Sequence, residues 1–500
     1  MLTFNTNENE YIYDDYTGMV FPLPDLVKEI IPLSGLSKDE VILKLERKFP
    51  NREKDIAHSY ELVKKWHKIG AFSQYNPIES MREPTVEELR EYVLRKGLRG
   101  FTLNVTQNCN LRCRYCAYSG EYDYFRVHSP KRMNFETAKK GIDVYFSLID
   151  EGRKYNPNRK PSVGFYGGEP LLEFPLIKSC VEYIKNSYGD HIAYTITTNG
   201  TLLDEKKIDY LLKNDFSLII SLDGPKDEHD RNRAYPSGRG SFDDVMGNIE
   251  TLKKFAESGK VQNVYTISVH DWRTDLFKVQ DFFNEDPFII PMLATGVNPL
   301  FGCHYYERFT EKDLDKFSRQ LDEIRKKYLE EAKSHHHNME KLAYFDLIVG
   351  QPVNQLLFLR FVLYKPYPFL PCTGACVPGR KLFVECDGTI HICERVNDKF
   401  PIGNVEKGLD FNKVREVMIK YQGILKNCCD CPIKRVCSEC YCGFETDSFK
   451  WDEKRCKSRI EDVKGALSYG YAIGESNPSF FDQFTENYYR TLKEVLKELE

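Results

Sequence analysis

The chain has no apolar run long enough to cross a membrane. None of its 500 residues falls in a stretch approaching the 18 or more apolar residues that a spanning helix needs. The first residues, Met1 to Glu8, lack the basic start and apolar core of a secretory signal. The formal net charge is only −4, which does not indicate binding to nucleic acid or to an anionic membrane surface. We therefore expect a cytosolic protein that binds neither nucleic acid nor membrane.

A reducing compartment leaves disulfides without a role, yet the chain has sixteen cysteines. Three of them lie between residues 109 and 116, and eleven lie between residues 372 and 456. Cys180 falls in an apolar helical pattern and is expected in the core, whereas Cys303 is expected either as a buried structural thiol or at the active site. The uneven placement predicts two metal-binding regions far apart in sequence.

The length and a hydrophobic content of 41% predict several folded domains. Residues 1–85 are expected to form an α+β unit, with two short strands between Glu10 and Phe21 and a helix that opens at Ser37 in a capping-box pattern with Glu40. A further helix is expected from Asp55 to Ile69, ending at Gly70.

Residues 95–305 alternate between apolar strands and amphipathic helices, which predicts an α/β fold with a parallel sheet. Helices are expected at Asn134–Asp150 and Phe174–Ser187. The expected strands are Phe101–Val105, Val163–Tyr166, Ala193–Thr197, Ser217–Leu222 and Val264–Val269. A helical bridge is expected over 306–371, with a charged helix at Glu311–Lys333. A helical tail is expected over 461–500, ending in a helix at Thr491–Glu500. His335, His336 and His337 in the bridge are expected in a solvated loop, with metal binding as the alternative.

The first cysteine group has the spacing C-x3-C-x2-C, with Cys109, Cys113 and Cys116 directly after an apolar strand. Three thiolates in one loop can hold three irons of a [4Fe–4S] cube and leave the fourth iron open to a small molecule. A zinc site would require a fourth Cys or His nearby, and none follows locally. The motif predicts a cluster that binds and reduces a ligand.

The second group contains Cys372-x3-Cys376, then Gly388-x4-Cys393, then Cys428-x2-Cys431-x5-Cys437-x2-Cys440, and finally Cys456. Pairs of the form C-x2-C also occur in zinc ribbons, so zinc is the alternative to iron in this region. Iron–sulfur clusters are favoured because the first motif requires electron transfer at low potential.

These motifs resemble those of the radical S-adenosylmethionine (SAM) superfamily, with Tyr115 as the aromatic residue before the last cysteine. The resemblance implies a partial (β/α)6 barrel with its chemistry at the C-terminal ends of the strands. It also implies that residues at four strand ends bind SAM. These residues are Tyr115, Gly167, Gly168, Glu169, Pro170, Thr198, Asn199, Ser221, Asp223 and Arg233, with Arg231 as the rival of Arg233 for the SAM carboxylate.

Residues 372–460 resemble the SPASM domain, the module that carries auxiliary [4Fe–4S] clusters in radical SAM enzymes. The resemblance implies three clusters in the whole chain. One auxiliary cluster would use Cys372, Cys376, Cys393 and Cys440, and the other Cys428, Cys431, Cys437 and Cys456. The usual pattern has a cysteine where this chain has Tyr441, so the ligand is either Cys440, which we favour, or Cys442.

The N-terminal unit resembles the winged-helix-like, PqqD-like leader-recognition domains of peptide maturases, which bind a peptide as an added strand. Simple packing on the core is the alternative. The resemblance implies a ribosomally made precursor peptide as substrate, a donor such as flavodoxin or ferredoxin, and cleavage of SAM to a 5′-deoxyadenosyl radical. A Cys thioether, as formed by sactipeptide and ranthipeptide maturases, is the expected product.

Three alternatives remain at this stage. A carbon–carbon or carbon–oxygen crosslink is the second choice of product, and formylglycine formation in a sulfatase is the third. The non-enzymatic alternative is a zinc-stapled adaptor that binds peptides. No residue specifies the bond that is made, and no acidic pair is singled out as the general base.

Overall fold

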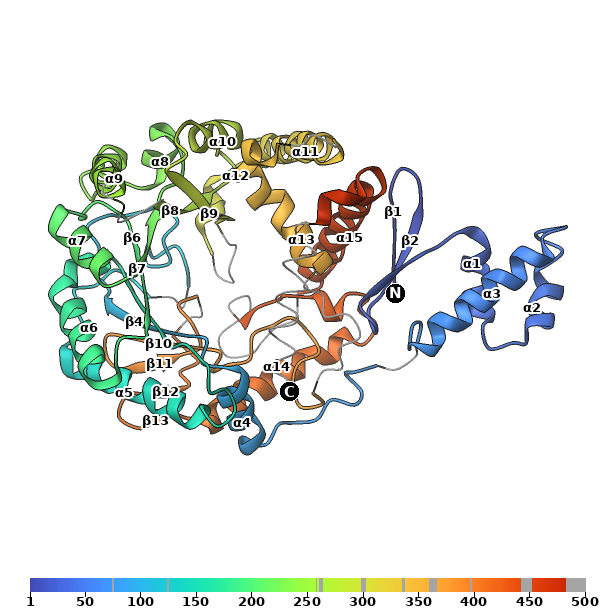
Figure 1. Ribbon diagram of the computed structural model, residues 1–500, viewed down its shortest axis with the longest axis horizontal. Coiled ribbons are helices and arrows are strands. Elements are labelled where there is room, and N and C mark those ends of the chain that lie inside the picture. The colour runs from blue at the N-terminus through green and yellow to red at the C-terminus, as the bar shows by residue number, and fades with distance from the viewer. Residues whose placement is uncertain are drawn as a thin grey trace.

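The computed structural model describes residues 1–73, 76–123, 126–257, 259, 264–297, 303–334, 338–358, 367–395, 398–441 and 452–482. Figure 1 shows a large body built on a curved sheet, with a smaller helical lobe at one end. In the described part of the chain, no helix is both long and apolar enough to span a membrane. The expected helix at Thr491–Glu500 and the run His335–His337 lie outside the described residues.

Six parallel strands form the centre of the body, in the order β4-β5-β6-β7-β8-β9. They are β4 (Gly100–Thr106), β5 (Ser162–Gly167), β6 (Ala193–Thr198), β7 (Phe216–Ser221), β8 (Val264–His270) and β9 (Ile289–Gly296). The helices between them are α5 (Phe135–Gly152), α6 (Phe174–Tyr188), α7 (Glu205–Lys213), α8 (Lys226–Asn232), α9 (Phe242–Glu257) and α10 (Leu276–Glu285). The alternating pattern of the sequence is therefore confirmed, and the sheet is an open, partial barrel.

The helices cover the outer face of this sheet (Figure 1). Alternate residues of β4, such as Phe101 and Leu103, are buried on that side, and Phe101 stacks on Tyr145 of α5 at 4.9 Å. Cys180 of α6 is fully buried in the same core, as predicted. Asn134 caps α5 by accepting from the backbone N–H of Thr137, which explains why the helix begins there.

The cysteine-rich region is joined to the barrel rather than set apart from it. Strand β10 (Lys381–Val384) pairs in parallel with β4, so that Lys381 lies opposite Gly100. Three short strands continue the sheet to ten, namely β11 (Thr389–His391), β12 (Gly403–Asn404) and β13 (Gly408–Leu409). This pairing joins segments almost 300 residues apart, which local sequence patterns do not reveal.

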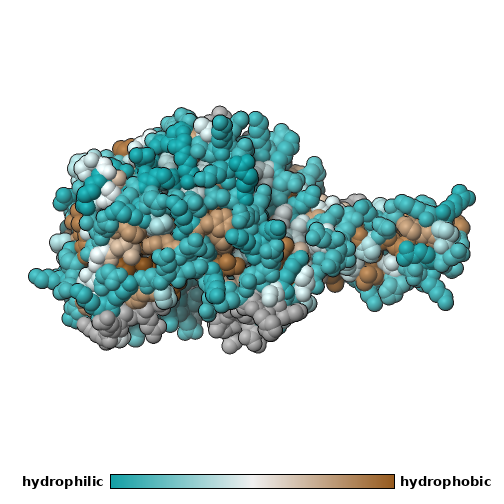
Figure 2. Space-filling view, turned by 90° about the horizontal axis from the view of Figure 1, so that it is seen from above, coloured by the Kyte–Doolittle hydropathy of each residue, from teal (hydrophilic) through white to brown (hydrophobic). Residues whose placement is uncertain are grey.

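The N-terminal unit contains a three-stranded antiparallel sheet and three helices. Its elements are β1 (Leu2–Asn5), β2 (Glu10–Asp14), β3 (Met19–Pro22), α1 (Asp25–Ile30), α2 (Lys38–Leu45) and α3 (Glu53–Lys68). The predicted capping box of Ser37 and Glu40 is present at α2, and Gly70 follows α3 with φ +92°. Strand β1 was not predicted. Figure 2 shows the lobe projecting from the main body.

The two faces of the N-terminal sheet pack on different partners. Ile12 and Phe21 face α1–α3, whereas Phe4 and Tyr13 face α15 (Glu453–Ser476) and Ile433. Neighbouring residues of a strand point to opposite faces, so one short sheet serves two cores. The N-terminal unit thereby packs on the cysteine-rich region through this sheet.

The remaining helices bridge these parts. They are α4 (Val86–Lys96), α11 (Glu311–Lys333), α12 (Ala343–Phe345), α13 (Gln351–Phe358) and α14 (Phe411–Leu425). Short 3-10 turns occur at η1 (Ile31–Leu33), η2 (Pro170–Glu173), η3 (Tyr305–Arg308), η4 (Met339–Leu342), η6 (Lys426–Cys428), η7 (Lys434–Val436) and η9 (Pro478–Phe481), and a π turn at η5 (Asp346–Gly350). Helix α15 begins before Cys456 and extends well beyond residue 461, so it runs across the boundary that the sequence predicts there.

Candidate active site

The loop that follows β4 carries Cys109, Cys113 and Cys116 at the C-terminal end of the central strands. Backbone N–H groups point at two of the sulfurs, from Leu111 to Cys109 at 3.4 Å and from Tyr118 to Cys116 at 3.4 Å. Such donors favour a thiolate, which is the form that binds metals.

Burial, together with the nearby thiol of Cys116, nevertheless raises the pKa of Cys109 and of Cys113 to about 12. The pKa of Cys116 is also raised by burial. Three half-buried thiols whose pKa values are raised need a cation to become thiolates. This donor set fits the three-cysteine ligation of a [4Fe–4S] cube.

Gly168, at the end of β5, lies directly against the cysteine loop. A Cβ atom on Gly168 would meet the carbonyl oxygen of Asn108 at 2.1 Å and the Cβ of Cys109 at 3.1 Å. Gly167 is equally confined, because its Cβ would meet the carbonyl oxygen of Thr106 at 2.5 Å. The two glycines of the predicted cofactor motif therefore let β5 approach the loop that holds the thiols.

Glu169 is completely buried, and its carboxylate ties β5 to β6. It accepts from the backbone N–H of Leu171 at 3.0 Å, from the Thr198 hydroxyl at 2.7 Å and from the backbone N–H of Asn199 at 2.8 Å. Burial raises the pKa of Glu169, and these three donors oppose that rise. A carboxylate has about four acceptor positions, so Glu169 retains capacity for one further donor. Pro170 follows it at the start of η2 and is buried.

The end of β6 contacts the first cysteine of the loop. The Asn199 side-chain amide donates to the sulfur of Cys109 at 3.7 Å and to the side-chain oxygen of Asn110 at 2.9 Å. Asn110 in turn donates to the Thr201 hydroxyl at 2.8 Å. Asn199, predicted from its place at a strand end, thus lies in contact with the thiol loop.

Asp223 follows β7 and connects three parts of the site. Its carboxylate accepts from the Tyr115 hydroxyl at 2.5 Å, from Nε of Arg233 at 2.9 Å and from the backbone N–H of Val269 at 3.0 Å. The Arg233 guanidinium also lies 5.3 Å from the Tyr115 ring centre and 4.0 Å from the Cys113 sulfur. Tyr115, Asp223 and Arg233 are therefore brought together beside the thiols, while Ser221 is half-buried at the end of β7.

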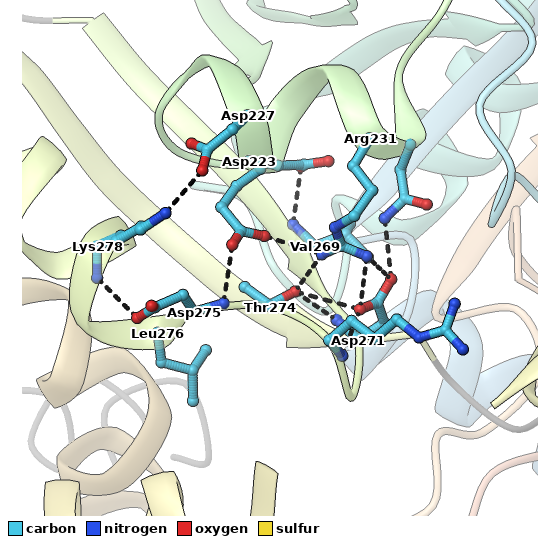
Figure 3. Close-up of polar contacts among 12 residues, drawn as sticks. Asp223, Asp227, Arg231, Val269, Asp271, Thr274, Asp275, Leu276 and Lys278 are labelled. Carbon is cyan, nitrogen blue, oxygen red and sulfur yellow. Dashed lines mark hydrogen bonds and ion pairs between the residues drawn. The ribbon is translucent and has the colours of Figure 1, made fainter. Parts of the chain in front are cut away.

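Arg231 is directed elsewhere, into a second polar network around Asp271 (Figure 3). Its guanidinium donates to both carboxylate oxygens of Asp271, at 2.8 and 2.6 Å, and to Glu228 at 2.9 Å. Asp271 also accepts from the Tyr305 hydroxyl at 2.6 Å. Helix α8 ends between the two arginines, so they lie on different sides of it, and Arg233 is the one beside the cysteines.

Several polar residues of the site have no strong sequence signal. Glu385, in the turn after β10, forms a buried ion pair with Arg126 and accepts from the Asn104 amide at 2.6 Å. Burial raises the pKa of Tyr166 on β5, and nearby Glu394 and Cys116 raise it further. Glu394 directly follows Cys393, and this position next to a predicted metal ligand is the sequence feature that could have identified Glu394 as a residue of the site. Arg126 lies in an irregular loop that offers no pattern.

In the cysteine-rich region, Cys428 lies near the three other thiols of its predicted ligand set. The pKa of Cys428 is raised to about 12 by burial and then by Cys431, Cys456 and Cys437. Cys372, predicted in the other set, also lies near, because it raises the pKa of Cys428 and is itself affected by Cys431.

Two thiols of the other predicted set, Cys440 and Cys376, lie near Tyr441. Burial raises the pKa of Tyr441, and these two thiols raise it further. Tyr441 is a core residue that packs on Tyr421 at 4.7 Å, so the position where the usual pattern has a cysteine is filled by an aromatic ring. Cys393 is half-buried after β11, and Cys442 lies outside the described residues.

Over the described residues, no three His, Cys, Asp or Glu side chains are arranged to share one metal ion. An iron–sulfur cube binds each thiolate through a different iron, so its ligands stand farther apart than those of a single ion. The donor chemistry of both regions, thiols grouped on loops and a helix start, fits cubes.

The comparisons with known proteins agree with this geometry. Residues 103–272 match the model of the radical SAM superfamily. A cysteine-type anaerobic sulfatase-maturating enzyme of Clostridium perfringens is 26% identical over 377 residues, covering 73% of this chain and 90% of that protein. The radical SAM cyclopropyl synthase TigE of Paramaledivibacter caminithermalis is 29% identical over 220 residues, or 43% of each chain.

The solved structure of native anSMEcpe with bound AdoMet and the Kp18Cys peptide has the same fold, with a TM-score of 0.55 and 22% identity. It covers 76% of this chain, and 99% of that chain is matched. Residues 103–272 therefore form a radical SAM domain, and the chain is a radical SAM enzyme related in sequence to the anaerobic sulfatase-maturating enzymes.

Proposed function

We propose that this enzyme binds SAM and three [4Fe–4S] clusters and oxidatively modifies a ribosomally made peptide, with a Cys thioether as the product. The observation that carries the cofactor part is the contact of Cys109 with Gly168 and Asn199, and of Cys113 with Arg233, at adjoining strand ends. The bound cluster and SAM would supply an adenosyl radical that takes a hydrogen atom from the substrate.

The protein residues supply binding and shape. Arg233 offers a guanidinium at the open end of the barrel, and the remaining acceptor capacity of Glu169 suits an ammonium group. Asn199 and the backbone N–H groups of the loop direct hydrogen-bond donors at the sulfurs. The same contacts orient the thiols and lower the cost of their ionisation.

Thioether formation can be balanced with these parts. The substrate carbon loses one hydrogen atom, the substrate thiol loses one proton, and the new carbon–sulfur bond leaves one electron. Two thiol sets would hold auxiliary clusters able to accept that electron, namely Cys372, Cys376, Cys393 and Cys440, and Cys428, Cys431, Cys437 and Cys456. Strand β10, which lies between Cys376 and Cys393, joins the first set to the barrel. Flavodoxin or ferredoxin would supply the electron for SAM cleavage.

Two observations support a peptide substrate with a leader. About a quarter of this chain has no counterpart in the related structure, which is itself matched almost completely. The N-terminal sheet, in the order β1-β2-β3, leaves β3 as an edge strand next to the α1–α3 lobe. Edge strands take up peptides by adding a strand, which is the binding mode that we propose for the leader.

Formylglycine formation is the second candidate, because the C. perfringens relative is named a sulfatase-maturating enzyme. The two products are told apart by mass. A thioether lacks two hydrogen atoms relative to the precursor, whereas oxidation of Cys to formylglycine replaces the thiol with an aldehyde oxygen. Incubation with a Cys-containing sulfatase peptide and with the peptide encoded beside this gene, followed by mass spectrometry, decides between them.

The cofactor proposal is tested by iron and sulfide analysis on protein purified without oxygen. Three cubes predict about twelve irons in the wild type and about eight in the Cys109/Cys113/Cys116→Ala variant, with SAM cleaved only by the wild type. Cys386→Ala is the matched control, because its thiol donates to the backbone oxygen of Asn104 at 3.1 Å, and it keeps all irons. Stoichiometric zinc without SAM cleavage would instead identify a peptide-binding adaptor.

A further inference from the structure

The turn between β2 and β3 of the N-terminal sheet lies against the loop that carries Cys431 and Cys437. Asp15 in this turn is 8% exposed and accepts from the backbone N–H of Arg435 at 2.9 Å. The Arg435 side chain reaches back and donates to the carbonyl oxygens of Asp15, at 2.8 Å, and of Tyr16. The side chain of each residue thus binds the backbone of the other segment.

Lys434 extends this contact to the cysteines themselves. Its ammonium donates to the carbonyl oxygens of Cys431 at 2.8 Å and of Cys429 at 3.2 Å, and lies 3.8 Å from the Asp15 carboxylate. Lys434 is largely buried, with 12% of its side chain exposed. A buried ammonium needs a nearby anion, and Asp15 is the carboxylate that pairs with it.

The same face of the sheet packs on the helix that provides the last thiol. Phe4 and Tyr13 share a core with Ile433 on the loop and with Val463 and Leu467 of α15. Helix α15 begins next to Cys456, and at its far end Glu475 accepts from Tyr11 at 2.7 Å. Both the loop and the helix that carry this thiol set are therefore held by the N-terminal sheet.

We propose that the N-terminal sheet is a structural part of the Cys428–Cys431–Cys437–Cys456 site and that Asp15 is its positioning residue. Asp15 fixes the conformation of the segment between Cys431 and Cys437, so that these thiols face Cys428 and Cys456. The inference rests on the proposed auxiliary cluster. A deletion of the N-terminal unit would therefore remove a support of the metal site together with any leader-binding surface.

The test uses the full-length protein and does not depend on activity. Asp15→Ala, purified without oxygen, is expected to lose about four of about twelve irons, because one cube loses its binding geometry. Glu10→Ala is the matched control on the same sheet and keeps the full content, since among the described residues its carboxylate pairs with the exposed Lys28. Asp15→Ala with all irons bound would overturn the proposal.

A second variant covers the case in which Asp15→Ala does not fold. Asp15→Asn has the same size and keeps an acceptor for Arg435, but lacks the charge that faces Lys434. Its iron is expected to pass to a chelator several-fold faster than that of the wild type, and release at the wild-type rate would overturn the proposal. A wild type that holds only four irons would instead refute the auxiliary clusters and so the proposed function itself.

Discussion

Gly168 has no room for a side chain because the carbonyl oxygen of Asn108 would lie 2.1 Å from its Cβ. We predict that Gly168→Ala displaces the loop of Cys109 and Cys113 and removes about four irons, those of the first cube. Gly247→Ala in α9 is the control, because nothing lies within 4 Å of its Cβ and alanine favours a helix by ~1 kcal/mol. Iron analysis and thermal unfolding of both variants are the measurements. Full iron content in Gly168→Ala would contradict the close contact.

Arg233 and Asp223 form a buried ion pair, with side chains 8% and 3% exposed. Replacing Arg233 with Met leaves a buried carboxylate without its cation, which we expect to lower the free energy of unfolding by ~3–5 kcal/mol. The double variant with Asp223→Asn is expected to lose less than the sum of the two single losses. Denaturant unfolding of the four proteins measures this coupling.

Arg239→Met provides the comparison at the surface, since the exposed pair of Arg239 and Asp244 is screened by solvent and is expected to contribute little to the free energy of unfolding. Equal losses in Arg233→Met and Arg239→Met would show that the buried pair has no special role.

The sequence predicted Asp223 because it directly follows an apolar strand, where side chains meet at one edge of a parallel sheet. It left Arg231 and Arg233 as rivals because both lie in one short segment and differ only in direction around α8. That direction depends on Asp271, which binds Arg231 from a strand end 40 residues away. Local patterns do not contain such a contact.

At the scale of elements, α8 is joined to the end of β7 by His229, which is fully buried. Nδ1 of His229 accepts from the backbone N–H of Asp223 at 3.4 Å, and Nε2 lies 3.0 Å from the Ser241 hydroxyl, which donates to the carbonyl oxygen of Arg233. A proton on Nδ1 would point at the backbone N–H of Asp223, which is itself a donor, so the geometry disfavours the doubly protonated ring. Burial, with the Arg233 charge, accordingly lowers the pKa of His229 to about 3, although Asp223 opposes this.

This lowered pKa sets the sign of a pH dependence. Between pH 6.5 and about 3, the unfolded chain binds a proton at His229 that the folded chain does not, so the free energy of unfolding falls as the pH falls. His270 and His391, whose pKa values burial lowers to about 4, act in the same direction. We predict that His229→Gln makes this dependence shallower, as measured by urea unfolding from pH 7 down to about 4. The exposed His191→Gln is the control, and an unchanged slope in His229→Gln would contradict the prediction.

Elements whose own sequence determines them were predicted well. Helix α11 has the predicted bounds Glu311–Lys333, and its capping box of Thr310 and Asp313 explains the sharp start. By contrast, the pairing of β10 with β4 depends on chain segments distant in sequence, and the short strands β12 and β13 have only two residues each. Strand β10 lies within the predicted unit 372–460 and β4 within the predicted barrel, so one sheet runs through both.

At the scale of the whole molecule, the described residues form three hydrophobic clusters. The largest extends through the barrel and the cysteine-rich region, the second lies within the α1–α3 lobe, and the third lies between the N-terminal sheet and α15. Composition predicted several domains but not how they share elements. The sheet β1–β3 belongs to two clusters at once, because its residues alternate between faces.

This sharing predicts that two substitutions on opposite faces of one sheet have separable effects. Ile12→Ala removes a buried side chain on the lobe face, at a cost of ~2–5 kcal/mol, and is expected to speed amide hydrogen exchange in α1–α3 while the iron content stays unchanged. Phe4→Ala, at a cost of ~3–5 kcal/mol, acts on the face that packs against α15, where Phe4 lies 5.5 Å from the Tyr471 ring.

For Phe4→Ala we therefore expect faster exchange in α15 and a lower iron content, with the lobe helices still protected. Hydrogen exchange read by mass spectrometry, with iron measured on the same samples, resolves the two patterns. Because both substitutions lie on one small sheet, a general loss of stability would speed exchange in the lobe and in α15 alike in both variants. That common pattern would show that the N-terminal unit unfolds as a single body and that its two faces do not act separately.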